Sequence, residues 1–149
     1  QRLRRVLVDC GLHDVGSDAT EATVGNTRLL IGGNELPWFG PPTDFQAFGP
    51  RDSSGFMLRL LLAHSPDQFA WAQRQDVDLM LAGHWHGGQV RFPLIGPVLA
   101  PSLHGTRYTD GVFRSGNTVM HVSRGTSGLA PFRFNFPPEV SLLTLTGAA

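Results

Sequence analysis

Two almost uninterrupted apolar runs, separated by a short polar segment, constrain the fold of this chain more than any other feature. The first run covers residues 56–63 (FMLRLLLA) and the second covers residues 77–82 (VDLMLA). Apolar runs of this length without alternation are typical of strands buried on both faces of a parallel sheet. We therefore predict two buried strands in an α/β fold.

The polar segment between the two runs carries the signals of a helix start. Ser65 can cap a helix, Pro66 suits its first position, and Gln68 can close a capping box. We predict a helix that ends near Gln75. Together with the two runs, this helix makes residues 56–82 a strand–helix–strand unit.

Each of the two predicted strands is followed by histidine. His64 follows the first strand, and His84 and His86 follow the second. If the strands are neighbours in a parallel sheet, these histidines meet at its carboxyl edge, where α/β sheets place their ligand sites. Residues two apart in an extended segment point to one face, so an H-x-H pair can bind one metal ion or contact two.

These features also have a structural explanation, which must be weighed against a metal site. A single histidine at a strand end, such as His64, is more often a hydrogen-bonded structural residue, and helix capping alone accounts for the SPDQ segment. The combination favours a metal site, because two apolar strands both end in histidine. Gly87 and Gly88 directly follow the His84–His86 pair and allow the backbone to turn sharply.

Outside this unit, the chain predicts further strands. We expect strands at residues 27–31, 118–123 and 140–146, and the alternation in the last predicts one exposed face. The first nine residues indicate a helix end that runs into a strand, with a strand or a helix-to-strand junction at residues 6–8. Residues 34–50 are rich in proline and glycine and predict an ordered loop.

Aromatic residues are concentrated in the predicted loop. Trp38, Phe39 and Phe45 all belong to it. We expect these side chains to pack against the protein. Contact with an acyl chain is the alternative for a loop of this composition.

Composition excludes several classes of function. Twelve basic residues balance twelve acidic ones, which argues against a dedicated nucleic-acid binder. All twelve basic residues are arginine, so Schiff-base and Walker-type lysine chemistry is excluded. Cys10 is the only cysteine, which rules out an intramolecular disulfide framework. Neither a signal peptide nor an apolar run of about 18 residues is visible.

The motifs at the two strand ends resemble those of a known family. AHSPD at residues 63–67 and AGHWHGGQ at residues 82–89 are similar to the last two motifs of the calcineurin-like metallophosphoesterases, H-x-P-D and G-H-T-H-G-G-Q. Trp85 stands where threonine is commoner, and both histidines of the motif are in place. The resemblance extends over residues 27–146, which is most of the chain.

The continuation of the chain resembles one branch of that family more closely. Residues 90–97 (VRFPLIGP), 122–128 (VSRGTSG) and 136–145 (FPPEVSLLTL) are similar to the membrane-associated bacterial phosphoesterases that act on lipid-type phosphodiesters. The resemblance therefore implies a phosphate-ester substrate, with lipid-linked esters included. It also implies peripheral membrane contact, whereas the balanced charge is what predicts no nucleic-acid partner. Cytoplasmic and membrane-associated locations both stay open.

The resemblance also implies a fold and a reaction. Residues 1–149 would form the C-terminal part of a single metallophosphoesterase domain, a four-layer α/β/β/α sandwich. The implied reaction is hydrolysis of a phosphomonoester or phosphodiester by a water that two divalent metal ions activate. Mn, Zn and Fe all suit histidine and carboxylate ligands.

Carried over residue by residue, the resemblance assigns three metal ligands. His64 and His84 would bind the second metal ion, and His86 would bind the first. Gly83 and Gly87 would shape the turn around the H-x-H pair. The catalytic residues themselves would come from the N-terminal motifs.

Three further residues are weaker candidates. Asp67 would start the helix or orient His64 behind the metal. Arg124 could bind phosphate through bidentate hydrogen bonds, although arginines more often lie on a solvated surface. His104 could line a substrate cleft, although a histidine without a partner at motif spacing is more often structural.

The family also needs upstream motifs that this chain does not match. They are D-x-H, G-D and G-N-H-D or G-N-H-E, which supply a bridging aspartate, an asparagine ligand and a histidine that assists the leaving group. Asn34 lies in G-N-E, which lacks the histidine. We expect the chain to be part of a longer enzyme and to hydrolyse little by itself. A degenerate homologue and a non-catalytic metal-binding or structural module are the alternatives.

Overall fold

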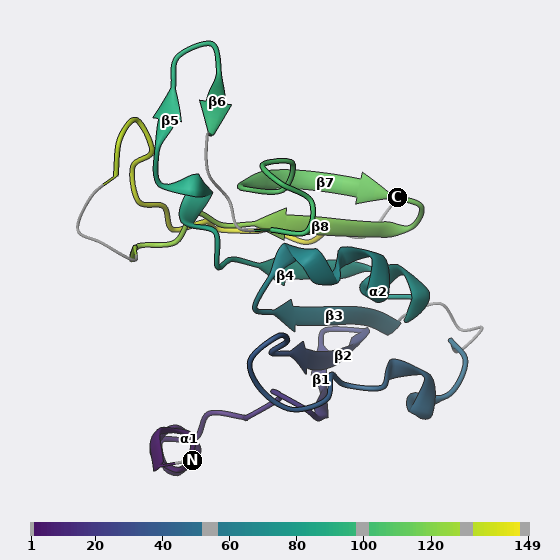
Figure 1. Ribbon diagram of the computed structural model, residues 1–149. Coiled ribbons are helices and arrows are strands. Elements are labelled where there is room, and N and C mark those ends of the chain that lie inside the picture. The colour runs from purple at the N-terminus through teal and green to yellow at the C-terminus, as the bar shows by residue number, and fades with distance from the viewer. Residues whose placement is uncertain (1, 52–56, 98–101, 129–132, 147–149) are drawn as a thin grey trace.

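The fold is built on one mixed sheet of six strands. The computed structural model describes residues 2–51, 57–97, 102–128 and 133–146 (Figure 1). The strand order is β1-β2-β3-β4-β8-β7, in which β2, β3, β4 and β8 are parallel and the edge strands β1 and β7 are antiparallel. The strands are β1 (Ala19–Val24), β2 (Thr27–Asn34), β3 (Met57–Ala63), β4 (Leu79–Ala82), β7 (Gly111–Ser115) and β8 (Thr118–Val122).

The predicted strand–helix–strand unit is confirmed. Between β3 and β4 lie the 3-10 turn η2 (Pro66–Gln68) and the helix α2 (Phe69–Arg74), and β3 pairs with β4 in parallel. The hydroxyl of Ser65 accepts a hydrogen bond from the backbone N–H of Asp67 at 3.2 Å, as a helix cap does. The predicted capping box does not form, because the side chain of Gln68 instead accepts a hydrogen bond from Asn34 at 3.4 Å.

The core lies between the sheet and α2. The side chains of Leu30, Leu61, Met80 and Met120, on four adjacent strands, are fully buried together with Ala72 of α2. Figure 1 shows α2 lying along the middle of the sheet. Phe45, in the 3-10 turn η1 (Phe45–Phe48), is also fully buried, so this aromatic residue packs as expected.

The prediction that β3 is buried on both faces is wrong. Arg59 and Leu61 point towards the core and are 3 % and 0 % exposed, whereas Leu62 is 41 % exposed. Successive residues of a strand point to opposite faces. The other face of β3 is therefore only partly covered by the described residues, although its residues are as apolar as those of the core face.

Both ends of the described chain differ from the prediction. The expected strand at residues 6–8 belongs to the helix α1 (Arg2–Asp9), which has no buried residue. The expected strand at residues 140–146 is not a strand, and Val140 and Leu142 are 85 % and 94 % exposed. An alternating sequence forms a strand only where a neighbouring strand accepts its backbone hydrogen bonds, and this segment has no such neighbour among the described residues. The edge strands β1 and β7 were not predicted.

A small second sheet completes the described fold. The strands β5 (Arg91–Phe92) and β6 (Gly96–Pro97) form an antiparallel hairpin. In Figure 1 it extends away from the six-stranded sheet, on the side where the arrowheads of β3 and β8 lie. No helix among the described residues is long and apolar enough to cross a membrane. The predicted α/β class is confirmed, and the mixed sheet with its helices is consistent with a portion of the expected sandwich.

Candidate metal centre

Two of the three predicted ligands meet at the carboxyl edge of the sheet. His64 directly follows β3, and His84 comes two residues after the end of β4. Because β3 and β4 are parallel neighbours, their ends lie side by side, and the centroids of the two imidazole rings are 4.3 Å apart. The strand pairing therefore produces the juxtaposition that the sequence predicts.

Trp38 closes this pair of histidines from the loop that follows β2. Its indole Nε1–H donates a hydrogen bond to Nε2 of His64 at 3.0 Å. The centroid of its ring is 6.5 Å from that of His64 and 6.4 Å from that of His84. Trp38 therefore packs edge-on against the two histidines although it is 60 % exposed. Phe39 is 66 % exposed, so the expectation that it packs is wrong. The pair of Trp38 and His64 joins residues 26 positions apart, which no local motif in the sequence indicates.

Asn34 holds the Trp38 loop and His64 to the end of β2. Its side chain is fully buried, and its Oδ1 accepts a hydrogen bond from the backbone N–H of Leu36 at 3.0 Å. Its backbone carbonyl accepts a hydrogen bond from the N–H of His64 at 2.9 Å. Asn34 therefore fixes the backbone on both sides of the Trp38–His64 contact.

The surroundings of both histidines favour the neutral imidazole. Burial lowers the pKa of His64, and the nearby charge of Glu35 opposes this effect. Burial also lowers the pKa of His84, as does proximity to His64 and His86. The ring of Trp85 lies 4.3 Å from that of His84 and contributes to this burial. A neutral imidazole has a free nitrogen lone pair, which is the form that binds metal ions.

The turn that carries His86 has an unusual backbone. His84, His86 and Gln89 have φ of 75°, 49° and 54°, in the left-handed region that residues with a side chain rarely adopt. Non-glycine residues in this region cluster at functional sites, because the surrounding structure must hold them there. The 3-10 turn η3 (His86–Gly88) lies inside this segment.

The two glycines assigned to this turn differ in whether the surrounding structure leaves space for a side chain. Gly87 has φ of 68°, and a Cβ at this position would lie 1.8 Å from Cε1 of Phe136. The ring of Phe136 therefore packs directly on the backbone of the turn. A Cβ at Gly83 would meet only the backbone oxygen of Ser123, at 3.9 Å, so the structure places no steric demand on that glycine.

The described residues do not form a complete metal site. Within the described ranges, no group of three or more His, Cys, Asp or Glu side chains could hold a metal ion. His86 lies close enough to lower the pKa of both His64 and His84. Its assignment as a ligand stays a prediction, as do those of His64 and His84.

Asp67, in the 3-10 turn η2 before α2, binds the loop at residues 102–104. Its carboxylate accepts hydrogen bonds from the hydroxyl of Ser102 at 2.5 Å and from the backbone N–H of Leu103 at 3.3 Å. The carboxylate thus binds the 102–104 loop and makes no hydrogen bond to His64 among the described residues. The proposed orientation of His64 by Asp67 stays a prediction.

The two weaker substrate candidates occupy different surroundings. Nε of Arg124 donates a hydrogen bond to Glu139 at 2.8 Å, and this contact lowers the pKa of the Glu139 carboxyl. Arg124 also lies 5.1 Å above the ring of Phe136, so its guanidinium is already held by two groups. His104 lines a cavity of about 200 Å³ beside α2, and its ring is 5.3 Å from that of Tyr108.

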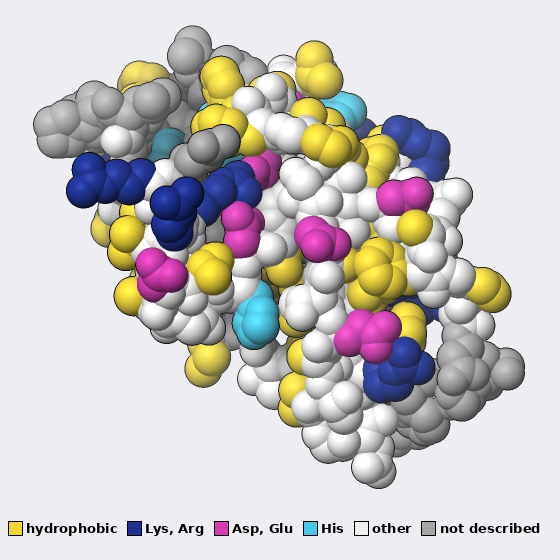
Figure 2. All heavy atoms as spheres, turned by 90° about the horizontal axis from the view of Figure 1, so that it is seen from below, with side chains coloured by type: hydrophobic (Ala, Val, Ile, Leu, Met, Phe, Trp, Pro, Cys, Tyr) yellow, Lys and Arg dark blue, Asp and Glu magenta, His cyan; other side chains and the backbone are white. Residues whose placement is uncertain are grey.

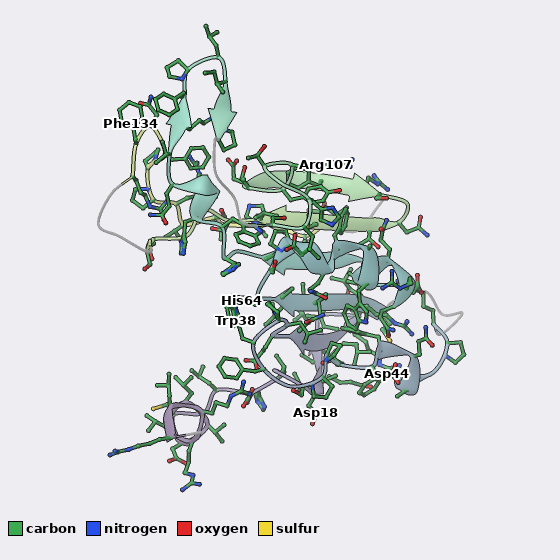
Figure 3. All side chains as sticks on the ribbon, in the orientation of Figure 1. Asp18, Trp38, Asp44, His64, Arg107 and Phe134 are labelled. Carbon is green, nitrogen blue, oxygen red and sulfur yellow. The ribbon has the colours of Figure 1, made fainter. Side chains whose placement is uncertain are left out.

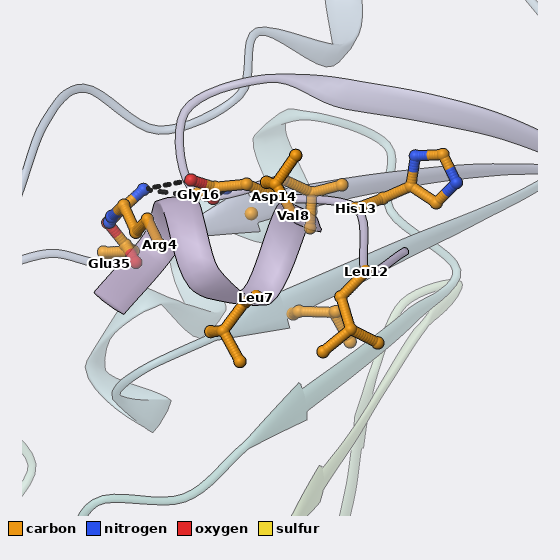
Figure 4. Close-up of a pocket in the computed structure, with 11 residues that line it drawn as sticks. Arg4, Leu7, Val8, Leu12, His13, Asp14, Gly16 and Glu35 are labelled. Carbon is orange, nitrogen blue, oxygen red and sulfur yellow. Dashed lines mark hydrogen bonds and ion pairs between the residues drawn. The ribbon is translucent and has the colours of Figure 1, made fainter. Parts of the chain in front are cut away.

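A larger cavity lies between α1 and the less covered face of the sheet. It has a volume of about 390 Å³, and Leu7 of α1 and Leu62 of β3 contribute to its apolar lining. At its rim, Arg4 binds the carboxylates of Asp14 and Glu35 (Figure 4). The backbone N–H of Gly16 and the Arg4 guanidinium lower the pKa of Asp14. No pattern in the sequence predicted this cavity, because its two sides lie far apart along the chain.

Comparison with known proteins gives several relatives. The chain is 36 % identical over 140 residues to phosphodiesterase YaeI of Escherichia coli, which is 93 % of this chain and 49 % of that protein. It is 38 % identical over 90 residues to the uncharacterized metallophosphoesterase YkuE of Bacillus subtilis, or 60 % of this chain and 31 % of that protein. It is 26 % identical over 131 residues to UDP-2,3-diacylglucosamine pyrophosphatase LpxG of Chlamydia trachomatis, or 82 % of this chain and 38 % of that protein.

The chain therefore spans about half or less of the length of these relatives. A scan against protein families gives no match, and no solved structure matches the chain. The relatives share a class of reaction in their names, which are those of phosphodiesterases, metallophosphoesterases and a pyrophosphatase.

Proposed function

The chain belongs to the calcineurin-like metallophosphoesterase family, and on this premise we propose that it contributes to a metal-dependent phosphoesterase. The observation that carries the proposal is the meeting of His64 and His84 at the carboxyl edge of the sheet, with ring centroids 4.3 Å apart. Parallel α/β sheets place their ligands at this edge.

The residues at this edge fit a divalent metal ion. Burial lowers the pKa of His64 and of His84, which favours the neutral imidazole, the form that binds metal ions. We propose that these two side chains, with His86, would hold the metal ions. The chemistry that such ions supply to a phosphoesterase is activation of water and neutralisation of charge on the phosphoryl group.

The chain's own residues position these ligands. Asn34 anchors the backbone of His64. The indole N–H of Trp38 occupies the Nε2 lone pair of His64, so a metal ion that bound this atom would displace the indole. Phe136 packs on Gly87 and holds the turn that carries His86. These contacts keep the imidazoles near one another before any ligand binds.

We propose that the remaining ligands come from outside these 149 residues. The resemblance requires a bridging carboxylate, and no motif in this chain supplies one. The chain spans 49 % of the length of its relative from Escherichia coli, which leaves room for such motifs in the relative. A phosphate ester is the proposed substrate. Lipid-linked esters are included, because one relative is named for UDP-2,3-diacylglucosamine.

Calorimetric titration with Zn²⁺ or Mn²⁺ tests the metal site directly. We expect saturable binding that His64→Ala and His84→Ala each weaken by at least about tenfold. His13→Ala is the matched control, because His13 is exposed and the resemblance assigns it no metal. Absence of saturable binding would overturn the metal site and favour a structural module.

Hydrolysis of bis(p-nitrophenyl) phosphate tests the need for further ligands. We expect the chain alone to give no rate above background in Zn²⁺ or Mn²⁺. A clear metal-dependent rate that His84→Ala abolishes would show instead that these residues hold a complete site.

A further inference from the structure

Among the described residues, the cavity beside α2 is lined by basic and aromatic side chains and by no acidic one. Its volume is about 200 Å³, and its walls come from α2, from the turn that precedes β7 and from the end of β7. The basic residues that line it are His104, Arg107 and Arg114, and none of the three predicted metal ligands lines it. In Figure 3, Arg107 lies beside β7, whereas His64 lies near the arrowhead of β3.

The two arginines of this cavity have no carboxylate partner within the described part of the chain. Arg107 and Arg114 are both exposed, and the guanidinium of Arg107 lies 5.1 Å from the centroid of the Tyr108 ring. On the face that Figure 2 shows, by contrast, arginine side chains lie close to acidic ones. The arginines that are ion-paired to carboxylates are Arg4, Arg28, Arg51, Arg59 and Arg124. The N–H groups of the two cavity arginines therefore remain available to a bound anion.

Aromatic rings around Tyr108 form the apolar part of the cavity. The ring of Tyr108 meets those of Phe69 and Phe113 edge to face, with centroids 5.8 and 4.8 Å apart. The ring of His104 meets it in the same way at 5.3 Å. Aromatic groups favour contacts of this geometry. The cavity thus places an aromatic surface next to two positive charges.

Hydrogen bonds hold the walls of the cavity in place. The backbone N–H of His104 donates a hydrogen bond to the hydroxyl of Ser102 at 3.0 Å, and this hydroxyl in turn donates one to Asp67. Nε2 of Gln73 donates a hydrogen bond to the carbonyl of Ser115 at 3.2 Å, which joins α2 to the end of β7. Walls that are already ordered lose little conformational freedom when a ligand binds, which favours binding.

We propose that this cavity binds a small phosphate monoester that carries an aromatic ring. The phosphate of a monoester has a charge between about −1.5 and −2 at pH 7, which matches the two guanidiniums of Arg107 and Arg114. Guanidinium groups bind phosphate through paired hydrogen bonds, and the aromatic ring of the ligand would pack against that of Tyr108. The inference does not rest on the proposed metal centre, since none of the predicted metal ligands lines the cavity.

The size and charge of the cavity restrict the ligand. Sites for drug-sized ligands have volumes of about 300–1,000 Å³, so a cavity of about 200 Å³ admits only a small molecule. An aromatic carboxylate is the competing ligand, because arginine also binds carboxylates. It has a single negative charge, whereas the cavity has two guanidiniums and no acidic side chain among its described lining residues, so the charge favours the phosphate.

Titration with phenyl phosphate, followed by NMR, tests the proposal on the full chain. Tyr108 is the only tyrosine, so the ring signals of isotope-labelled tyrosine report on the cavity directly. With EDTA present to remove divalent metal ions, we expect these signals to shift in a saturable way. Benzyl alcohol, which has the ring but no charge, should bind at least about tenfold more weakly.

Two pairs of arginine substitutions then identify the groups that bind the anion. Arg107→Gln with Arg114→Gln should weaken the binding of phenyl phosphate by at least about tenfold. Arg2→Gln with Arg5→Gln is the matched control, because it removes the same charge from two exposed arginines of α1, and it should bind as the parent chain does. Far-UV circular dichroism checks that both variants keep the fold.

The absence of a saturable shift, or equal binding by the Arg107→Gln, Arg114→Gln variant, would overturn the proposal. Equal binding of inorganic phosphate would contradict the role of the ring, and equal binding of benzoate would contradict the preference for phosphate. Loss of binding in His84→Ala would place the anion at the carboxyl edge of the sheet instead. Calorimetric titration with Zn²⁺ should give the same result for the arginine variant and the parent chain, so lost phosphate binding with retained metal binding concerns the cavity alone.

Discussion

The two faces of the six-stranded sheet are made of similar residues but are buried to very different extents. On the face that α2 covers, Leu30, Leu61 and Met80 are fully buried. On the other face, Leu62 is 41 % exposed, and α1 approaches it across a cavity of about 390 Å³. The residues alternate along the same strands, so hydrophobicity does not explain the difference. The difference arises because α2 packs on one face only, and an apolar face is buried only where another element covers it.

Truncation of neighbouring leucines on β3 gives the largest expected contrast between the faces. Leu61→Ala should lower the free energy of unfolding by about 2–5 kcal/mol, because it leaves a cavity under α2. Leu62→Ala should cost about 1 kcal/mol or less, since this side chain is 41 % exposed. Urea denaturation of both variants measures the difference. Equal losses would show that the second face is covered as fully as the first.

At the carboxyl edge, Gly87→Ala should produce the next largest effect. The new Cβ would collide with the buried ring of Phe136, and the backbone has φ of 68°, so we expect a loss of about 1–3 kcal/mol. Gly25→Ala is the control, because it has φ of 59° and its Cβ would meet nothing within 4 Å. Urea denaturation of Gly25→Ala should show only the smaller loss that a side chain at positive φ causes. If both variants lose the same amount, the packing of Phe136 on the turn does not restrain it.

Loss of a helix cap tests the covering layer itself. Ser65→Ala removes the acceptor for the N–H of Asp67 and should cost about 1 kcal/mol in the free energy of unfolding. Ser141→Ala removes a hydrogen bond to Glu139 in the exposed segment at residues 140–146, and we expect a change within about 0.5 kcal/mol. Thermal unfolding followed by circular dichroism compares the two. A larger effect at Ser141 would mean that this segment stabilises the fold.

The pH dependence of stability should report on the histidine pair. Burial lowers the pKa of His64 and His84 below the ordinary 6.5, so the unfolded chain binds more protons in this range. Their contribution is complete above pH 6.5 and is lost as pH falls from that value towards the lowered pKa values. The double variant His64→Gln with His84→Gln should flatten this part of the stability profile, measured by urea denaturation across pH, whereas Leu142→Ala should leave its slope unchanged. A profile that the histidine variant does not alter would contradict the lowered pKa values.

Local signals predicted the centre of the fold well and its periphery poorly. The strands at β2, β3, β4 and β8 and the helix between β3 and β4 follow from apolar runs and from the cap at Ser65. The edge strand β1 was missed because ATEATV has few apolar residues, and its pairing with β2 provides the stabilisation. Residues 140–146 show the converse: their alternation is clear, yet no neighbouring strand is available among the described residues.

The candidate site likewise combines features that the local sequence predicts with contacts that only the fold produces. The sequence placed His64 and His84 at strand ends, and strand pairing then brought their rings to 4.3 Å. The hydrogen bond from Trp38 to His64 could not be predicted, because the two residues are 26 positions apart and lie on different strand-end loops. The same is true of Asp67, whose carboxylate binds Ser102 across 35 positions.

The sequence by itself determined the order of the central elements, the helix start at Ser65 and the histidines that follow β3 and β4, because these depend on residues a few positions apart. Only the tertiary structure decided which face of the sheet is covered, which histidines meet and on which side of the sheet the β5–β6 hairpin lies. Those features depend on contacts between distant segments, and such contacts form only where the packing of the whole sheet brings both partners together.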